Sequence, residues 1–471
     1  MSWRRLTGMD AAFLYGETAN APLNVIGVIV LESHSRQPGA DFERLRAQIE
    51  LRLPVLPILR RKLVEVPLGL DHPVWIEDPH FDLDAHVFRS ALRPPGGERE
   101  LERFVARLAE TPLRRDRPLW EMHVVEGVGR RRFALVAKVH HAAVDGVGGV
   151  GMLVALLDGD PEGKELVPAV PAPERRAPPP SVPSSLALLG DAALGLGRRP
   201  LRGARQLLRT GSAGARLLRA VAPAPSTRFN GRISSRRVVA IGSVSLDDVK
   251  AVKRAFAATV NHVVLAACAG ALRRYLAAYA EIPREPLVAA VPMALGARAA
   301  DGAGNALSVL RVRLPVHLAR ALDRLAAARE ASLEAMRLHE AVGPQLGDWA
   351  DLATPALFAG ATRLYHGLGL AAHHPPFHNV VISNVPGPAA PLYCAGARVT
   401  ACHPFGPIYE GWGLNVTVMS YAGRIGIGAI ACPERVPEVA RIPRAFEACV
   451  AQLHRLATGD ERRPGSRAAA R

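Results

Sequence analysis

Residues 139–146 read Val-His-His-Ala-Ala-Val-Asp-Gly, which places two adjacent histidines just before an aspartate and a glycine. The apolar run before them, residues 132–139, has the composition of a β-strand. Adjacent side chains of a strand point to opposite faces. We therefore expect one of His140 and His141 to face a cavity and the other to pack behind it, with Asp145 and Gly146 at the turn that follows.

The residue types around the two histidines favour acid–base chemistry. No serine or cysteine nucleophile lies beside them, so an imidazole here is expected to act as a general base on a substrate hydroxyl or amine. A metal pair is the alternative, but adjacent strand side chains diverge and no third ligand follows at helical spacing. His373, His374 and His378 form a second cluster, for which a polar surface loop is favoured over a metal site. No metal site is predicted.

The glycines that follow, Gly-Val-Gly-Gly-Val-Gly at 146–151, also fit the pattern G-x-G-x-x-G. A dinucleotide site would need a second parallel strand and an acidic residue about 20 positions later. Here the expected helix runs into Asp158-Gly-Asp-Pro161 and a Pro-rich stretch. The pattern favours glycines that allow close approach of helix, strand and substrate.

Composition predicts a globular enzyme of two large domains. The chain has 471 residues, of which 49% are hydrophobic and 22% charged. Its five cysteines show no C-x-x-C spacing, as expected for reduced, structural cysteines in a cytosolic compartment. The N-terminus lacks the apolar region of a signal peptide, and no apolar run of about 18 residues predicts a spanning helix.

The net charge of +16 suits an anionic partner such as nucleic acid, anionic lipid or a phosphorylated cofactor. The basic residues are dispersed, and aromatic residues make up only 5% of the chain. That is too few for a platform on which bases stack. No nucleic-acid partner is predicted.

The pattern of elements predicts a mixed α+β fold with hairpins in both halves. We expect an N-terminal domain over residues 1–160, a Pro- and Arg-rich linker over 161–235, a C-terminal domain over 236–458 and a disordered tail over 459–471. Strands are expected at residues 23–32, 120–126, 132–139, 287–293, 308–314, 377–383, 414–421 and 424–430. Helices are expected at residues 41–53, 98–110, 150–157, 245–257, 260–278, 319–338 and 443–457.

Residues 184–221 alternate small or apolar residues with arginine. Two interpretations stay open and are compatible. The segment can be a solvated connector helix that packs its leucines on a domain, which the pattern favours, or a basic amphipathic helix on a membrane surface.

The motif at 140–146 resembles the HHxxxDG motif of the acyl-CoA-dependent acyltransferase superfamily, which includes chloramphenicol acetyltransferase, carnitine acyltransferases and peptide-synthetase condensation domains. Further segments resemble the bacterial wax ester synthase/diacylglycerol acyltransferases. Leu6–Leu14 is similar to the opening of those proteins, and Arg117–Trp120 contains a segment similar to their Pro-Leu-Trp motif. Thr259–Ala266 is similar to their TVNDVVLA segment, Asn379–Pro388 to their SNVPGP segment, and Gly411–Asn415 also fits the family. The resemblance runs from about residue 6 to residue 457 and implies two chloramphenicol-acetyltransferase-like domains with a long connector.

Two positions depart from that family. His262 stands where the family has the aspartate of an Asn-Asp pair. Gly296 stands where the family tends to have an arginine, and Arg298 follows two residues on. In related folds a distant arginine pairs with the motif aspartate, and Arg298 is the candidate for that pairing here. Both departures bear on substrate choice and on activity.

The resemblance implies acyl transfer from long-chain acyl-CoA, as a co-substrate, to the hydroxyl of diacylglycerol or of a long-chain fatty alcohol. In this mechanism His141 is the general base, His140 supports the motif, and Asp145 and Gly146 hold the turn. Asn261, Ser383 and Asn384 are candidate substrate contacts, whereas Pro118 and Trp120 are expected to pack. No permanently bound cofactor is expected, and no particular arginine is assigned to coenzyme A.

Lipid substrates imply a cytoplasmic protein that associates peripherally with the inner membrane or with lipid droplets. Two other functions stay open. One is transfer of a carrier-bound acyl group by another member of the superfamily. The other is a weakly active lipid-binding paralogue, prompted by His262 and Gly296.

Overall fold

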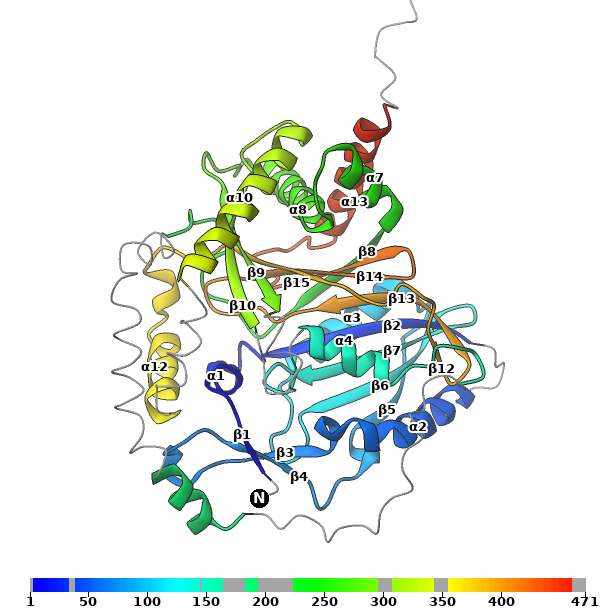
Figure 1. Ribbon diagram of the computed structural model, residues 1–471, viewed down its shortest axis with the longest axis vertical. Helices are drawn as coiled ribbons and strands as arrows, with labels where there is room; N and C mark the ends of the chain where they lie inside the picture. Colours follow the sequence, from blue (N-terminus) through cyan, green and yellow to red (C-terminus); the bar gives the residue numbers. More distant parts are fainter. Residues whose placement is uncertain are drawn as a thin grey trace, which may run out of the picture.

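The computed structural model describes residues 3–33, 39–144, 146–163, 183–193, 223–294, 307–342 and 355–459. These residues build two six-stranded sheets, a small three-stranded sheet and the helices that cover them (Figure 1). The first large sheet has the strand order β12-β13-β2-β7-β6-β5. Its strands are β2 (Asn24–Glu32), β5 (Val87–Ala91), β6 (Trp120–Gly129), β7 (Arg132–His140), β12 (Tyr393–Cys394) and β13 (Ala397–Phe405).

The second large sheet has the order β10-β9-β11-β14-β15-β8. Its strands are β8 (Val238–Ser245), β9 (Leu287–Ala294), β10 (Leu307–Leu314), β11 (Val380–Val385), β14 (Leu414–Tyr421) and β15 (Arg424–Ala431). In both sheets, antiparallel pairs sit beside parallel ones, since β5 runs parallel to β6 and β11 runs parallel to β9 and β14. This is the mixed α+β architecture that the sequence predicts.

Helices cover the outer faces of the sheets, and two further helices, α3 (Glu98–Glu110) and α4 (Gly146–Ala155), contact strands of both sheets. Figure 1 shows α7 (Leu246–Ala255), α8 (Val260–Ala277), α10 (Ala321–Val342) and α13 (Arg441–Thr458) above the second sheet. The first sheet carries α2 (Ala40–Arg52) and α4, while α3 contacts β8 as well as β2 and β6. At one end lie α1 (Gly8–Gly16), α12 (Pro355–Gly367) and the small sheet of β1 (Arg4–Arg5), β3 (Arg61–Val64) and β4 (Val74–Glu77).

The two halves of the chain share a sheet. Strand β13 comes from late in the chain, yet it pairs antiparallel with β2 and extends the first sheet. It crosses β15 so closely that a Cβ on Gly426 or Gly428 would lie 1.9 Å from a carbonyl oxygen of β13. Glycine is therefore required at both positions. The predicted domain boundaries remain predictions. They do not anticipate that β13, from the C-terminal half of the chain, belongs to the first sheet.

The two predicted hairpins are confirmed. Strand β6 pairs with β7, and β14 pairs with β15, both antiparallel. The predicted strands and helices have counterparts, with shifted ends in several cases; the helix expected at 150–157 begins at Gly146. The sequence pattern does not predict α1, α12, the small sheet, β5, β8, β12 or β13.

Of the predicted linker, only residues 161–163, 183–193 and 223–235 are described. Residues 185–193 are helical, and Leu188 and Ala192 pack on Val66, Val74 and Ile76. The remainder of the segment over 184–221 and nearly all of the predicted tail lie outside the described residues. Within the described ranges no single helix is long and apolar enough to cross a membrane, and only the bent pair α7 and α8 passes on length and composition together.

Candidate active site

The two histidines occupy different environments at the end of β7. His140 is the last residue of the strand and is only 1% exposed, whereas His141 begins the following turn and is half-buried. The backbone N–H of His141 donates to the carbonyl of Leu23 at 2.9 Å, which anchors the turn to the residue before β2. The sequence predicts this division into a buried and an accessible imidazole.

The ring of His141 is held by an aromatic neighbour. Phe13 of α1 stacks on the imidazole, with ring centroids 4.1 Å apart and planes 7° from parallel. Such a contact restricts the rotation of the imidazole and keeps one of its faces covered. Phe13 thereby fixes where a general base on His141 would act.

His140 is held through both ring nitrogens. Its Nδ1 accepts the backbone N–H of Ala142 at 3.0 Å. Its Nε2 lies 3.5 Å from Oε1 of Glu17, which is long for a hydrogen bond but close enough for strong electrostatic attraction. Because Nδ1 accepts, a neutral His140 carries its proton on Nε2 and directs it toward the carboxylate.

Glu17 is a functional candidate that the sequence analysis missed. It follows the C-terminus of α1, where a negative charge is unfavourable unless cations compensate for it. Arg115 Nη2 lies 2.9 Å from its Oε2, and the N–H of Leu23 donates to Oε1 at 3.3 Å. Burial alone would raise the pKa of Glu17, but His140 and Arg115 outweigh it and hold the pKa below its ordinary value. An acid at a helix C-terminus is the signal that could have identified it.

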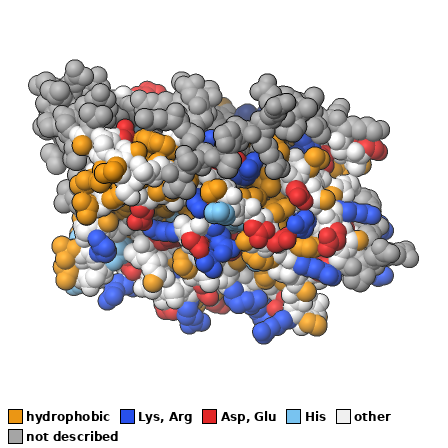
Figure 2. Space-filling view, turned by 90° about the horizontal axis from the view of Figure 1, so that it is seen from below, with side chains coloured by type: hydrophobic (Ala, Val, Ile, Leu, Met, Phe, Trp, Pro, Cys, Tyr) orange, Lys and Arg blue, Asp and Glu red, His pale blue; other side chains and the backbone are white. Residues whose placement is uncertain are grey.

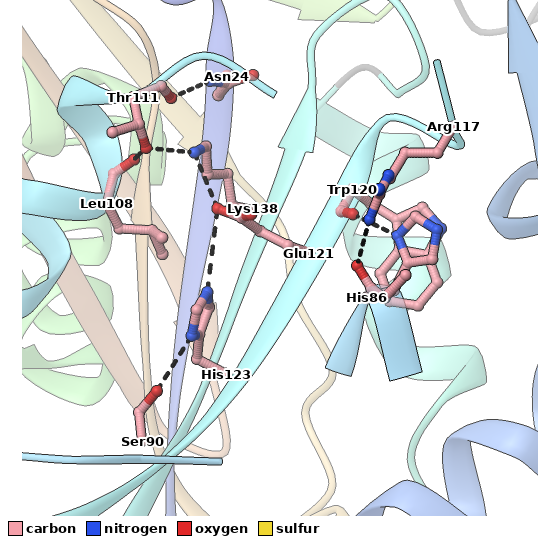
Figure 3. Close-up of polar contacts among 11 residues, drawn as sticks. Asn24, His86, Ser90, Leu108, Thr111, Arg117, Trp120, Glu121, His123 and Lys138 are labelled. Carbon is pink, nitrogen blue, oxygen red and sulfur yellow. Dashed lines mark hydrogen bonds and ion pairs between the residues drawn. The ribbon is translucent and has the colours of Figure 1, made fainter. Parts of the chain in front are cut away.

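A row of polar side chains with the buried Lys138 among them continues from this site along the sheet (Figure 3). Lys138, two residues before His140, is fully buried, and its Nζ lies 2.9 Å from Glu121 and 3.0 Å from the hydroxyl of Thr111. Glu121 also faces His123, which contacts Ser90. Burial lowers the pKa of Lys138, and the carboxylates of Glu121 and Glu17 act in the opposite direction.

The other motif residues lie around the second sheet. Ser383 and Asn384 are half-buried on β11, paired with Thr417 and Val418 of β14. Asn261 lies in the first turn of α8. Both α4, which starts at Gly146, and α8 contact β11, so β11 is the element shared by the three motifs. Asp145, Gly296 and Arg298 lie outside the described residues.

His262 has a structural position in the first turn of α8. Its backbone N–H donates to the Thr259 hydroxyl, and its Nδ1 accepts the backbone N–H of Thr259, both at 3.2 Å. This is a capping box with histidine in place of the usual acid. Burial, with Arg329 nearby, lowers the pKa of His262 and keeps the ring neutral, as this acceptor role requires.

Pro-Leu-Trp at 118–120 packs, as expected. The indole of Trp120 is 2% exposed, stacks on His86 at 4.5 Å and donates to the carbonyl of Leu59 at 2.7 Å (Figure 3). Of the glycines in α4, Gly149 and Gly151 are the two whose surroundings are described, and neither makes the predicted close approach. A Cβ on Gly151 would meet nothing within 4 Å, whereas Gly27 of β2 would meet Leu153 of α4 at 3.1 Å. Close approach of helix and strand therefore depends on Gly27.

The second histidine cluster is only partly a surface loop. His373 and His374 are exposed, but His378 is 7% exposed and packs on Trp412 with centroids 4.3 Å apart. The prediction of a surface loop is wrong for His378. This residue lies two positions before β11, whose first residue, Val380, is fully buried, so the chain has already entered the interior there. Within the described ranges no three His, Cys, Asp or Glu side chains are grouped to hold a metal ion.

The cysteines are not placed to act as nucleophiles. All five are buried and outside any disulfide. Burial raises the pKa of the thiols of Cys394 and Cys402 to about 12 in each case. Thiolates are the reactive form, so these groups do not compete with the histidine motif as a reactive centre.

Comparisons with known proteins agree with this arrangement. The wax ester synthase/diacylglycerol acyltransferase catalytic domain matches residues 6–264, and the C-terminal domain of the same family matches residues 303–454. A Mycobacterium tuberculosis (strain CDC 1551) protein named as a diacylglycerol O-acyltransferase is 36% identical over 98% of this chain and 92% of its own length. A second protein with that name from the same strain is 35% identical over 96% of each chain.

Solved structures show the same fold. The wax ester synthase/diacylglycerol acyltransferase from Marinobacter aquaeolei VT8 superposes with a TM-score of 0.70 at 30% identity, covering 96% of this chain and 99% of that one. The first condensation domain of the CDA synthetase has a TM-score of 0.57 at 18% identity, covering 97% and 96% of the two chains. The second likeness concerns the fold alone. The chain belongs to the wax ester synthase/diacylglycerol acyltransferase family and is an O-acyltransferase.

Proposed function

We propose that this O-acyltransferase transfers a long-chain acyl group from acyl-CoA to the hydroxyl of diacylglycerol or of a long-chain fatty alcohol, with His141 as general base. The observation that carries the proposal is the contrast between the two histidines. His140 is held in the interior by Glu17 and Ala142, while His141 is more accessible and its ring is fixed by Phe13.

The proposed reaction needs only one base. An unprotonated imidazole of His141 accepts the proton of the acceptor hydroxyl as its oxygen attacks the thioester carbonyl. The carbon–sulfur bond then breaks, and the imidazolium returns the proton to the departing thiolate of coenzyme A. No acyl-enzyme forms, which agrees with the buried thiols. General-base assistance of this kind contributes roughly 10²–10⁴-fold to the rate.

Candidate substrate contacts come from the second sheet. Ser383 and Asn384 on β11, together with Asn261 on α8, offer hydroxyl and amide groups that can donate to the developing oxyanion. The contact of α4 with β11 supports their inclusion, since α4 begins at the end of the histidine motif. No permanently bound cofactor has a part in this proposal.

The test is an assay with defined donors and acceptors. Purified full-length protein is incubated with palmitoyl-CoA and either dioleoylglycerol or hexadecanol, and coenzyme A release and lipid product are both measured. Triacylglycerol or wax ester formation supports the proposal. Transfer only from an acyl carrier protein would point to a different superfamily reaction. Stoichiometric lipid binding without turnover would point to a weakly active paralogue, although the capping role of His262 gives that departure a structural explanation.

We also propose that the protein works in the cytoplasm at the surface of the inner membrane or of lipid droplets, through the end of the molecule that carries α12. Leu68, Leu186 and Leu364 are 84%, 81% and 61% exposed. Leu68 also adopts a left-handed backbone (φ 59°), which costs free energy in a residue with a Cβ and gains no burial in return. Hydrophobic side chains gather toward the left-hand end of the face in Figure 2, the end at which Figure 1 has α12.

The sequence beyond the helix at 185–193 fits an anionic lipid surface. Residues 194–222 contain seven arginines and no acidic residue. Co-sedimentation with phosphatidylglycerol vesicles tests the proposal, with phosphatidylcholine vesicles for comparison. Leu68→Ser and Leu186→Ser together should reduce binding several-fold, whereas Leu333→Ser on α10, also exposed, should not. Equal binding by all variants would contradict it.

A further inference from the structure

Two residues of one short segment contact the two histidines. Phe13 stacks on His141, and four positions later Glu17 faces Nε2 of His140. The side chain of Glu17 is itself held at both oxygens, by the N–H of Leu23 at Oε1 and by Arg115 at Oε2. Its position is therefore fixed independently of His140, so it can impose an orientation on the imidazole.

We propose that Glu17 is a positioning residue for the histidine pair. Its carboxylate holds His140 as the Nε2–H tautomer, which leaves Nδ1 free to accept the Ala142 N–H and so fixes the turn that presents His141. The proposal rests on the proposed role of His141, although its structural half can be tested without turnover.

The contacts of His140 select the tautomer with its proton on Nε2. A neutral imidazole has one donor nitrogen and one acceptor nitrogen. The N–H of Ala142 needs the acceptor at Nδ1, and the carbonyl of His140 is already accepting the N–H of Ala143. In the other tautomer, Nδ1–H would face an N–H group and the Nε2 lone pair would face a carboxylate. Both contacts would then be repulsive, and the turn would lose its support.

The surroundings of Glu17 favour its ionised form. Arg115, from the loop after α3, forms an ion pair with it, and the charge of Lys138 on β7 also interacts with it. Both cations offset the cost of placing a carboxylate in the interior. The Nε2–H of His140 therefore faces a charged acceptor.

Glu17→Gln is the direct test, because it removes the charge with little change of shape. Glu65→Gln, at an exposed position, is the matched control. Three quantities are measured: the tautomer of His140 by NMR of ¹⁵N-histidine-labelled protein, kcat/KM at pH 7, and the thermal midpoint. The His140 signal is assigned by its loss in His140→Gln.

The wild-type protein should show His140 as the Nε2–H tautomer. In Glu17→Gln that signal should move toward a tautomer mixture. At pH 7, kcat/KM should fall roughly ten- to hundredfold, the size of effect seen when a carboxylate that orients a metal-binding histidine is removed. Glu65→Gln should leave all three measurements unchanged.

An unchanged His140 tautomer in Glu17→Gln would overturn the proposal. A loss of kcat/KM with a lower thermal midpoint and an unchanged tautomer would assign Glu17 a merely structural role and would also overturn it. If the wild-type protein transfers no acyl group, the proposed function fails, and the tautomer measurement still decides whether Glu17 orients His140.

Discussion

The ring of Phe13 lies flat against the imidazole of His141, with centroids 4.1 Å apart and an interplanar angle of 7°. This contact joins the N-terminal helix to the end of β7, more than 120 positions further along the chain. It identifies α1 as part of the candidate site, although Phe13 itself is neither an acid nor a base.

Phe13→Ala should lower kcat about tenfold, because the imidazole of His141 loses the surface that restricts its rotation and a base displaced by about 1 Å loses much of its rate advantage. Phe13→Tyr keeps the ring and should retain most of the activity. Steady-state kinetics with both variants checks this. If Phe13→Ala keeps the wild-type kcat, the stacking has no part in positioning the base.

The ion pair between the buried Lys138 and the half-buried Glu121 predicts a non-additive effect on stability. Lys138→Met removes the nearest cation of the Glu121 carboxylate and should lower the free energy of unfolding by about 1–3 kcal/mol. Adding Glu121→Leu should recover most of that loss, since the unpaired charge is then absent. Urea denaturation measures both values. As a control, Lys250→Met breaks an exposed pair with Asp247 and should change stability by less than about 0.5 kcal/mol. Simple additivity of the two buried substitutions would contradict this account.

Stability should fall as the pH drops from about 6.5 toward 4. Burial is the main cause that lowers the pKa of His378 and of His403 to about 4, below the ordinary value of 6.5. Protons therefore bind the unfolded chain first, and each histidine contributes a slope of up to about 1.4 kcal/mol per pH unit in that window. Above pH 6.5 both are neutral in both states, and their contribution to the slope vanishes.

Replacing one of these histidines should flatten that dependence. His378→Phe keeps the packing on Trp412 and removes the titrating group, so the thermal midpoint should fall less between pH 6.5 and 4.5 than in the wild type. The exposed His374 supplies the control variant, His374→Phe, which should follow the wild-type curve. Parallel curves for all three proteins would show that His378 is not a source of the acid sensitivity.

His262→Ala should destabilise α8 by about 0.5–2 kcal/mol, because the N–H of Thr259 loses its acceptor in the capping box. His262→Asp restores the residue that the family has at this position. A carboxylate suits a helix N-terminus, so this variant should be at least as stable as the wild type. Chemical denaturation of the two variants compares them. A fully stable His262→Ala would mean that the cap contributes nothing.

The sequence predicts the parts of the fold that rest on local pattern. The apolar runs at residues 120–126 and 132–139, separated by the Gly-containing segment 127–130, mark the hairpin of β6 and β7. Strand β13 escapes this reasoning. Its place beside β2 depends on a partner far away in the chain and on two glycines of β15, which carry no signal of pairing in the sequence.

The same distinction applies to the site. The sequence predicts that one of His140 and His141 is buried and the other more accessible. The contacts of Phe13 and Glu17 with them could not be predicted, because they depend on how α1 is placed against the end of β7. His262 shows the converse: its departure from the family pattern suggested altered chemistry, and the structure places it in a helix cap.

The most direct test of the central claim is acyl transfer by His141→Ala compared with the wild type. Coenzyme A release from palmitoyl-CoA with dioleoylglycerol or hexadecanol is measured on folded proteins of equal thermal midpoint, with His454→Ala on the distant α13 as control. Because a general base contributes roughly 10²–10⁴-fold to the rate, we expect His141→Ala to lose at least 99% of kcat and His454→Ala to keep it. A folded His141→Ala protein with near wild-type turnover would contradict the account.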